Sequence, residues 1–258
     1  MGPSHSRQQS TSTMSLRYSP TYPPTRTFPQ QSEGVDTPTL TTALSYISTR
    51  LLQKTKVHHT FIVTGSILFS LFFRTRGYTT SVSLLQTSTL SPREKEVLIS
   101  SVIKAGEKYG IEREDWVNNS AEREVKKFGI EEGEVVRRSL EQGVVVYSGD
   151  GMTFYAVDFM YELRRGLWVL SEALEKGEDG GVEDLVELVR RLVAVEGKGR
   201  GLRRGVVEEG YGGLRFSDYA WMVVGREYER RFGERGLRED DEVEEVEEGG
   251  DEGILDTF

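Results

Sequence analysis

The stretch FIVTGSILFSLFFRTRGYTTSVSLLQ, residues 61–86, decides the fold that the sequence predicts. Thr60–Thr64 is β-branched and apolar, which is typical of a buried strand. Gly65-Ser66 follows as a turn, and Ile67–Arg74 predicts a short helix. Thr80–Leu85 then predicts a second strand. A strand, a tight turn, a short helix and another strand therefore follow one another within one short stretch.

Helical patterns flank this stretch on both sides. Upstream, Thr37 is expected to cap a helix, because apolar residues recur at helical spacing from Leu40 to Leu51. Downstream, the sequence SPRE at 91–94 predicts a capping box at the start of a long helix. Gly110 is placed to end that helix in a left-handed turn.

Later segments complete a mixed architecture. Residues 112–128 predict one or two short helices, and Val144–Tyr147 with Met152–Val157 predicts a hairpin. Three more helices are expected near 158–175, 182–196 and 217–232. This order predicts an α+β fold, with a small mixed β-sheet flanked by helices and a C-terminal helical part.

Composition divides the chain into three regions. Residues 1–35 are rich in Ser, Thr, Pro and Gln and are expected to be a disordered arm, because they offer too little apolar area to offset ordering entropy. Residues 36–236 are expected to form one folded domain. Residues 237–258 are expected to be an acidic disordered tail, since 239–252 hold ten acids and no base.

Charge and residue usage exclude several classes of protein. The net charge of -9 argues against a nucleic-acid binder, which needs a basic face. The chain has no cysteine, which excludes a disulfide scaffold, a Cys zinc site and a thiol nucleophile. The apolar run Phe61–Phe73 is too short to span about 30 Å of hydrocarbon as a helix. No membrane span and a cytoplasmic location are therefore expected, with nuclear and mitochondrial locations left open.

Two sets of residues are candidates for holding an anion. Gly65 lets the backbone approach a ligand, and the hydroxyl of Ser66 with the first N–H groups of the following helix could hold a phosphate. The alternative is a plain tight turn. The basic candidates are Arg74, Arg76, Arg164 and Arg165. Alternatively, Arg74 and Arg76 pair with surface acids. Arg164 and Arg165 would then lie on a solvated helix face.

The same stretch resembles the nucleotidyltransferase fold, particularly small families related to abortive-infection toxins and their uncharacterised fungal relatives. In those families a strand runs into Gly-Gly or Gly-Ser, and a short helix, an Arg-rich turn and an Asp-x-Asp strand follow. The likeness continues through EDWVNNS (114–120), MTFYAVDFMYELRRGLWVL (152–170), VEDLVELVRRL (182–192) and EYERRFGERG (227–236). The resemblance implies a phosphate turn at Gly65-Ser66 and a cleft that the Arg-rich turn and the basic helix face.

The sequence departs from that family at its metal ligands. Ser81 and Ser83 occupy the positions expected for Asp-x-Asp, and no acid lies between Asp36 and Glu94. Nucleotidyl transfer uses two Mg²⁺ ions, whose hard oxygen ligands come from carboxylates. The resemblance therefore implies a pseudoenzyme with no catalytic residues, no metal and no cofactor, which keeps nucleotide or phosphate binding without Mg²⁺ or acts as a regulatory module.

Two other interpretations stay open. In the first, the protein is an active Mg²⁺-dependent transferase whose carboxylates come from Asp150, Asp158 or Asp184; these acids are equally explained as a turn residue, an N-cap and a helix-start charge. In the second, the protein is a non-enzymatic interaction module that binds a protein partner through its termini.

Overall fold

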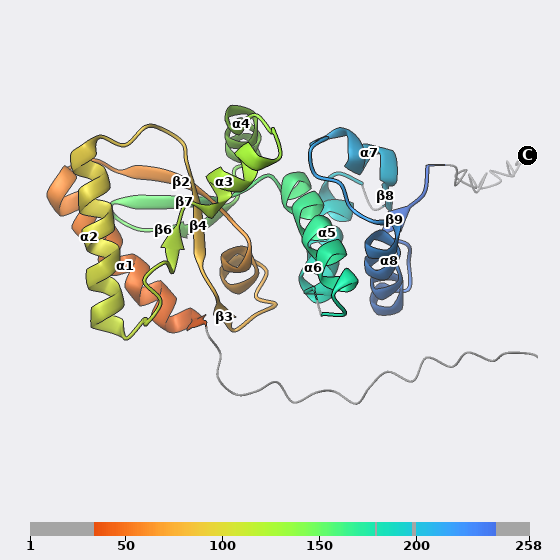
Figure 1. Ribbon diagram of the computed structural model, residues 1–258, viewed down its shortest axis with the longest axis horizontal. Coiled ribbons are helices and arrows are strands. Elements are labelled where there is room, and N and C mark those ends of the chain that lie inside the picture. The colour runs from red at the N-terminus through yellow and green to blue at the C-terminus, as the bar shows by residue number, and fades with distance from the viewer. Residues whose placement is uncertain (1–33, 179, 198–199, 241–258) are drawn as a thin grey trace, which may run out of the picture. The chain divides into compact units, whose positions relative to one another are not determined.

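The computed structural model describes residues 34–178, 180–197 and 200–240. The first part of the chain forms a five-stranded sheet in the order β5-β4-β2-β7-β6 (Figure 1). Its strands are β2 (His59–Thr64), β4 (Val82–Gln86), β5 (Val117–Asn118), β6 (Val145–Ser148) and β7 (Met152–Ala156). β2 pairs antiparallel with β4 and parallel with β7. The predicted α+β class with a mixed sheet is confirmed.

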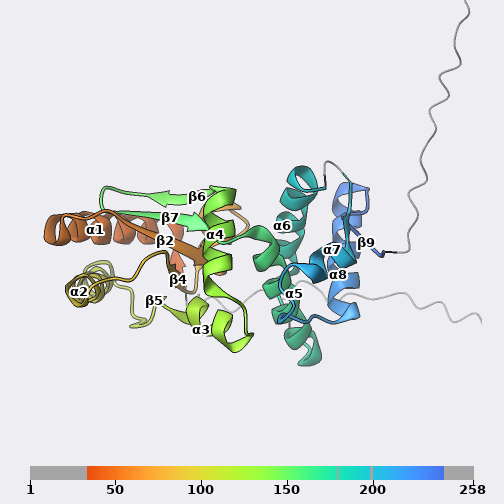
Figure 2. The same cartoon turned by 90° about the horizontal axis from the view of Figure 1, so that it is seen from above.

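Helices cover both faces of this sheet. The long helices α1 (Thr37–Thr55) and α2 (Pro92–Tyr109) lie side by side on the face that bears Phe61, Leu84 and Phe154 (Figures 1 and 2). The short helices α3 (Ser120–Lys127) and α4 (Glu132–Gln142) contact β4 and β7, respectively. Because both faces are covered, β2 is apolar throughout its centre, as the sequence predicts.

Local capping explains where the two long helices begin and end. In α2 the hydroxyl of Ser91 accepts from the N–H of Glu94, whose carboxylate accepts from the N–H of Ser91, which confirms the capping box. Gly110 ends α2 in the left-handed conformation, as predicted. The cap of α1 is Asp36 rather than Thr37, because the carboxylate of Asp36 accepts from the N–H of Thr39.

The C-terminal part is helical. Three predicted helices are present as α5 (Phe159–Glu175), α6 (Val182–Val195) and α8 (Asp218–Phe232), and each packs against the other two (Figure 2). A short helix, α7 (Arg204–Glu209), lies between α6 and α8 in the chain. The strand β8 (Leu202–Arg203) pairs parallel with β9 (Leu237–Arg238). Residues 237–240 thus belong to the fold and not to the predicted tail.

The centre of the deciding stretch differs in detail from the prediction. The expected short helix contains a π-helical turn, η1 (Leu68–Phe72). The second strand begins at Val82, and Tyr78–Thr79 forms β3, which pairs with β1 (Val35–Asp36). The predicted disordered arm, up to residue 33, and the predicted tail, from residue 241, lie outside the described residues. Across the described part of the chain, no helix is both long and apolar enough to cross a membrane.

Candidate functional site

The predicted phosphate turn is bound by a carboxylate of the protein itself. Gly65 adopts φ = 77°, a left-handed conformation that suits glycine, directly after β2. Its N–H donates to Oε1 of Glu162 at 3.2 Å, and the hydroxyl of Thr64 donates to Oε2 of the same residue at 2.6 Å. Glu162 lies in the first turn of α5 and is only 1% exposed. The Thr64 hydroxyl and the Gly65 N–H therefore already bind a side chain of the protein.

Arg165 joins this carboxylate to a second one. Its Nη1 lies 3.3 Å from Oε1 of Glu162, and its Nε donates to Oε2 of Glu124, in α3, at 2.5 Å. Burial raises the pKa of the Glu162 carboxyl, and the positive charge of Arg165 opposes that shift. The guanidinium of Arg165 thus contacts the carboxylates of Glu124 and Glu162. These contacts link α3, α5 and the end of β2.

The three serines of the predicted site make polar contacts within the fold. Ser66 Oγ lies 2.6 Å from the Thr79 hydroxyl oxygen and donates to the carbonyl of Ser81 at 3.2 Å. Ser83 pairs with Thr64 in the β2–β4 ladder, and its hydroxyl lies 2.6 Å from that of Ser120. Ser83 is therefore the strand partner of Thr64, which binds Glu162, whereas Ser81 precedes the first residue of β4.

The three distant acids belong to three different elements of the fold. Asp150 is exposed in the turn between β6 and β7. Asp158 caps α5 by accepting from the N–H of Met160, and Asp184 lies in the first turn of α6. Among the residues that the structure describes, no group of three or more histidine, aspartate or glutamate side chains could hold a metal ion.

The structure separates the four basic candidates. Arg164 is 3% exposed, and its guanidinium donates to the carbonyls of Glu208 at 2.6 Å and Leu214 at 2.7 Å. Burial lowers the pKa of this guanidinium from its ordinary value. Arg164 is held by these internal partners, whereas Arg165 lies beside Gly65, where an added Cβ would be 3.7 Å from its Nη1. That both side chains face one cleft with the Arg-rich turn stays a prediction.

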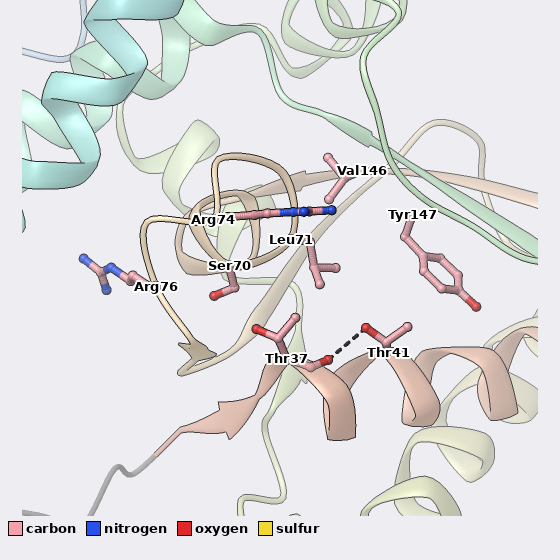
Figure 3. Close-up of a pocket in the computed structure, with 8 residues that line it drawn as sticks. All are labelled: Thr37, Thr41, Ser70, Leu71, Arg74, Arg76, Val146 and Tyr147. Atoms are coloured by element: carbon pink, nitrogen blue, oxygen red, sulfur yellow. Dashed lines mark hydrogen bonds between the residues drawn. The ribbon is translucent and has the colours of Figure 1, made fainter.

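Arg74 and Arg76 line a hollow of about 410 Å³ between α1, η1 and β6 (Figure 3). Arg74 extends across it toward Val146, whereas Arg76 points away and pairs with Asp184 at 2.5 Å. Arg74 is exposed, and no hydrogen bond or ion pair joins its side chain to another residue of the described ranges. The residues that line the hollow are Thr37, Thr41, Ser70, Leu71, Arg74, Arg76, Val146 and Tyr147.

Comparison with protein families gives one match, to a domain of unknown function, DUF7582, over residues 33–235. The chain belongs to the DUF7582 family. No curated protein and no solved structure matches it. The DUF7582 match includes the sheet, the hollow and the C-terminal helices to the end of α8. Nothing in these comparisons links the family to nucleotidyltransferases, so that resemblance stays a prediction.

Sequence reasoning missed Glu162 and named Asp184 only as a possible metal ligand or helix-start charge. Glu162 and Asp184 are both buried, and each binds groups from the stretch at 61–86. The available signal was a carboxylate between two apolar residues of a helix, as at Glu162 between Tyr161 and Leu163. Such an acid is rarely buried without a partner, but the sequence does not name that partner.

Proposed function

We propose that this DUF7582 protein is a non-catalytic module of nucleotidyltransferase-like fold that binds a phosphate or nucleotide, with the anion held at the hollow beside Arg74. The backbone of Arg74 carries the proposal. Its φ of 59° lies in the left-handed region, where a residue with a side chain costs about 1–2 kcal/mol. The same conformation ends α1 at Lys56. At Arg74, directly after η1, it directs an exposed guanidinium across a hollow.

The chemistry of the hollow favours an organic phosphate. The planar guanidinium of Arg74 can donate two parallel hydrogen bonds to phosphate oxygens. Thr37, Thr41 and Ser70 line the same hollow, with their hydroxyls donating to backbone carbonyls. Leu71, Val146 and Tyr147 give it apolar lining. Its volume is near the lower end of the range for small-molecule sites. These features support a small ligand with a charged group and a less polar body.

The cluster at the Gly65 turn favours binding over catalysis. A two-metal mechanism needs carboxylates that are free to bind Mg²⁺. Glu162 and Glu124 lie near the turn, but Arg165 contacts both of them. Ser83, at an expected metal-ligand position, bonds instead to the neighbouring hydroxyl of Ser120. A metal ion would have to displace a guanidinium to reach this carboxylate pair.

A thermal-shift titration with inorganic phosphate, AMP and ATP tests the proposal, each with and without Mg²⁺. We expect stabilisation of the full chain that does not need Mg²⁺ and that Arg74→Ala removes. Arg215→Ala is the matched control, because Arg215 is exposed and lies outside the hollow. Absence of any shift with the unaltered protein would overturn the proposal. Stabilisation by ATP that requires Mg²⁺ would favour an active metal-dependent enzyme instead.

A further inference from the structure

The loop that carries Arg74 is fixed through the two residues that follow it. After η1, the backbone N–H groups of Thr75 and Arg76 both donate to the carbonyl of Phe69, at 2.9 and 3.3 Å. The side chains of Thr75 and Arg76 both reach Asp184, at 2.6 Å and 2.5 Å. Arg74 thus stands next to two residues that share one carboxylate.

Asp184 reaches this loop from the other part of the domain. It lies in the first turn of α6, is 4% exposed and binds one partner with each carboxylate oxygen. The turn before α6 is shaped for the contact, because Gly181 has φ = 76° and a Cβ added there would lie 2.8 Å from Nη2 of Arg76. The start of α6 therefore contacts the loop through the Asp184 carboxylate, and the lack of a side chain at Gly181 leaves space for Arg76.

We propose that Asp184 is a positioning residue for the anion site: by holding Thr75 and Arg76, it keeps Arg74 in the left-handed conformation that presents its guanidinium to the hollow. This inference rests on the proposed function, in which Arg74 binds the anion. Asp184 does not line the hollow itself. It acts through the backbone of the loop, and it links the anion site to α6.

Neutralising Asp184 changes anion affinity in opposite directions for the two roles that it could have. If Asp184 acted only as a nearby negative charge, its neutralisation would strengthen anion binding, because a repulsive group is lost and Arg76 is released. If Asp184 positions Arg74, neutralisation weakens anion binding, because the loop loses its anchor. Thr75→Val removes one anchoring hydrogen bond without changing any charge, so positioning predicts the same direction for both variants.

The test measures the Kd of inorganic phosphate with the full chain by calorimetry. Asp184→Asn and Thr75→Val are each expected to raise Kd about tenfold, the size expected for loss of a charge-assisted hydrogen bond. Thr75→Ser keeps the hydroxyl and should bind like the unaltered protein. In the Arg74→Ala background, Asp184→Asn should have no further effect on binding. Equal or tighter binding by both Asp184→Asn and Thr75→Val would overturn the inference.

Amide hydrogen exchange separates this inference from the proposed function. The N–H groups of Thr75 and Arg76 should exchange faster in Asp184→Asn and Thr75→Val than in the unaltered protein, with or without phosphate. Unchanged protection in both variants would overturn positioning even if phosphate binds at Arg74. Faster exchange in these variants, when the unaltered protein binds no phosphate, would support control of the loop by Asp184. It would refute only the proposed anion site.

Discussion

The hydroxyl of Thr64 donates a 2.6 Å hydrogen bond to the buried carboxylate of Glu162. This contact joins the last residue of β2 to the first turn of α5 across 98 positions of the sequence. The N–H of Gly65 donates to the other oxygen of the same carboxylate. The end of the central strand is thereby fixed to the helical part by one acid.

Thr64→Val should destabilise the fold. The substitution keeps the shape of the side chain and leaves Oε2 of Glu162 without its short hydrogen bond, which is expected to lower the free energy of unfolding by about 1–3 kcal/mol. Urea denaturation measures the change. Thr60→Val, in the same strand, is the control, since no side-chain hydrogen bond of Thr60 is present within the described residues. Equal effects of the two variants would contradict the role of the Thr64–Glu162 contact.

Glu162→Gln should change how stability depends on pH. Burial raises the pKa of Glu162 above its ordinary value, so the folded state binds its proton more tightly than the unfolded state does. The contribution of this carboxyl to stability is therefore fully present below its unfolded pKa and is lost as pH rises through the folded value. The unaltered protein should lose stability relative to Glu162→Gln as pH rises from about 4. Urea denaturation of both proteins between pH 4 and 8 measures this, and a relative gain with pH would contradict it.

Gly65→Ala should strain the backbone at the turn. The added Cβ would lie 3.7 Å from Arg165, an ordinary contact, so the penalty comes from the left-handed φ and is expected to be about 1–2 kcal/mol. Gly77→Ala is the control, because Gly77 has no positive φ and its added Cβ would meet nothing within 4 Å. Thermal unfolding compares the two variants. A loss no larger in Gly65→Ala than in Gly77→Ala would show that the turn tolerates another conformation.

Restoring acids at the two serine positions tests the resemblance to nucleotidyltransferases. If Ser81 and Ser83 occupy former metal-ligand positions, the double variant Ser81→Asp with Ser83→Asp should gain Mg²⁺ binding, because carboxylates supply the oxygen ligands that Mg²⁺ prefers. The double Asn variant has a similar size without the charge and should gain none. Calorimetry with MgCl₂ gives the result. No binding by a folded double Asp variant would refute the assignment of these positions.

Local signals account for most of what the sequence predicted. The capping box at Ser91 and Glu94, the glycine that ends α2 and the hairpin of β6 and β7 depend on residues close in sequence, and all three are present. The helices of the C-terminal part follow from apolar periodicity in the same way. These elements could be predicted because their causes lie within a few turns of chain.

The remaining features depend on partners far apart in the sequence. Arg76 and Asp184 are brought together only when α6 packs near the loop after η1, and no local pattern names that pair. Likewise, β9 pairs with β8, which lies more than 30 residues earlier in the sequence. The sequence singled out Arg74 and Arg76 as basic candidates, and both line the hollow. It could not separate them from Arg164, because burial of that side chain is a tertiary effect.

The affinity of the hollow for inorganic phosphate tests the central claim most directly. Calorimetry in the absence of Mg²⁺ should give measurable binding to the unaltered protein, and Arg74→Ala should raise Kd at least about tenfold, because it removes a charge-assisted bidentate contact. Arg215→Ala should leave Kd unchanged. No binding by the unaltered protein, or equal binding by Arg74→Ala, would contradict an anion site at Arg74.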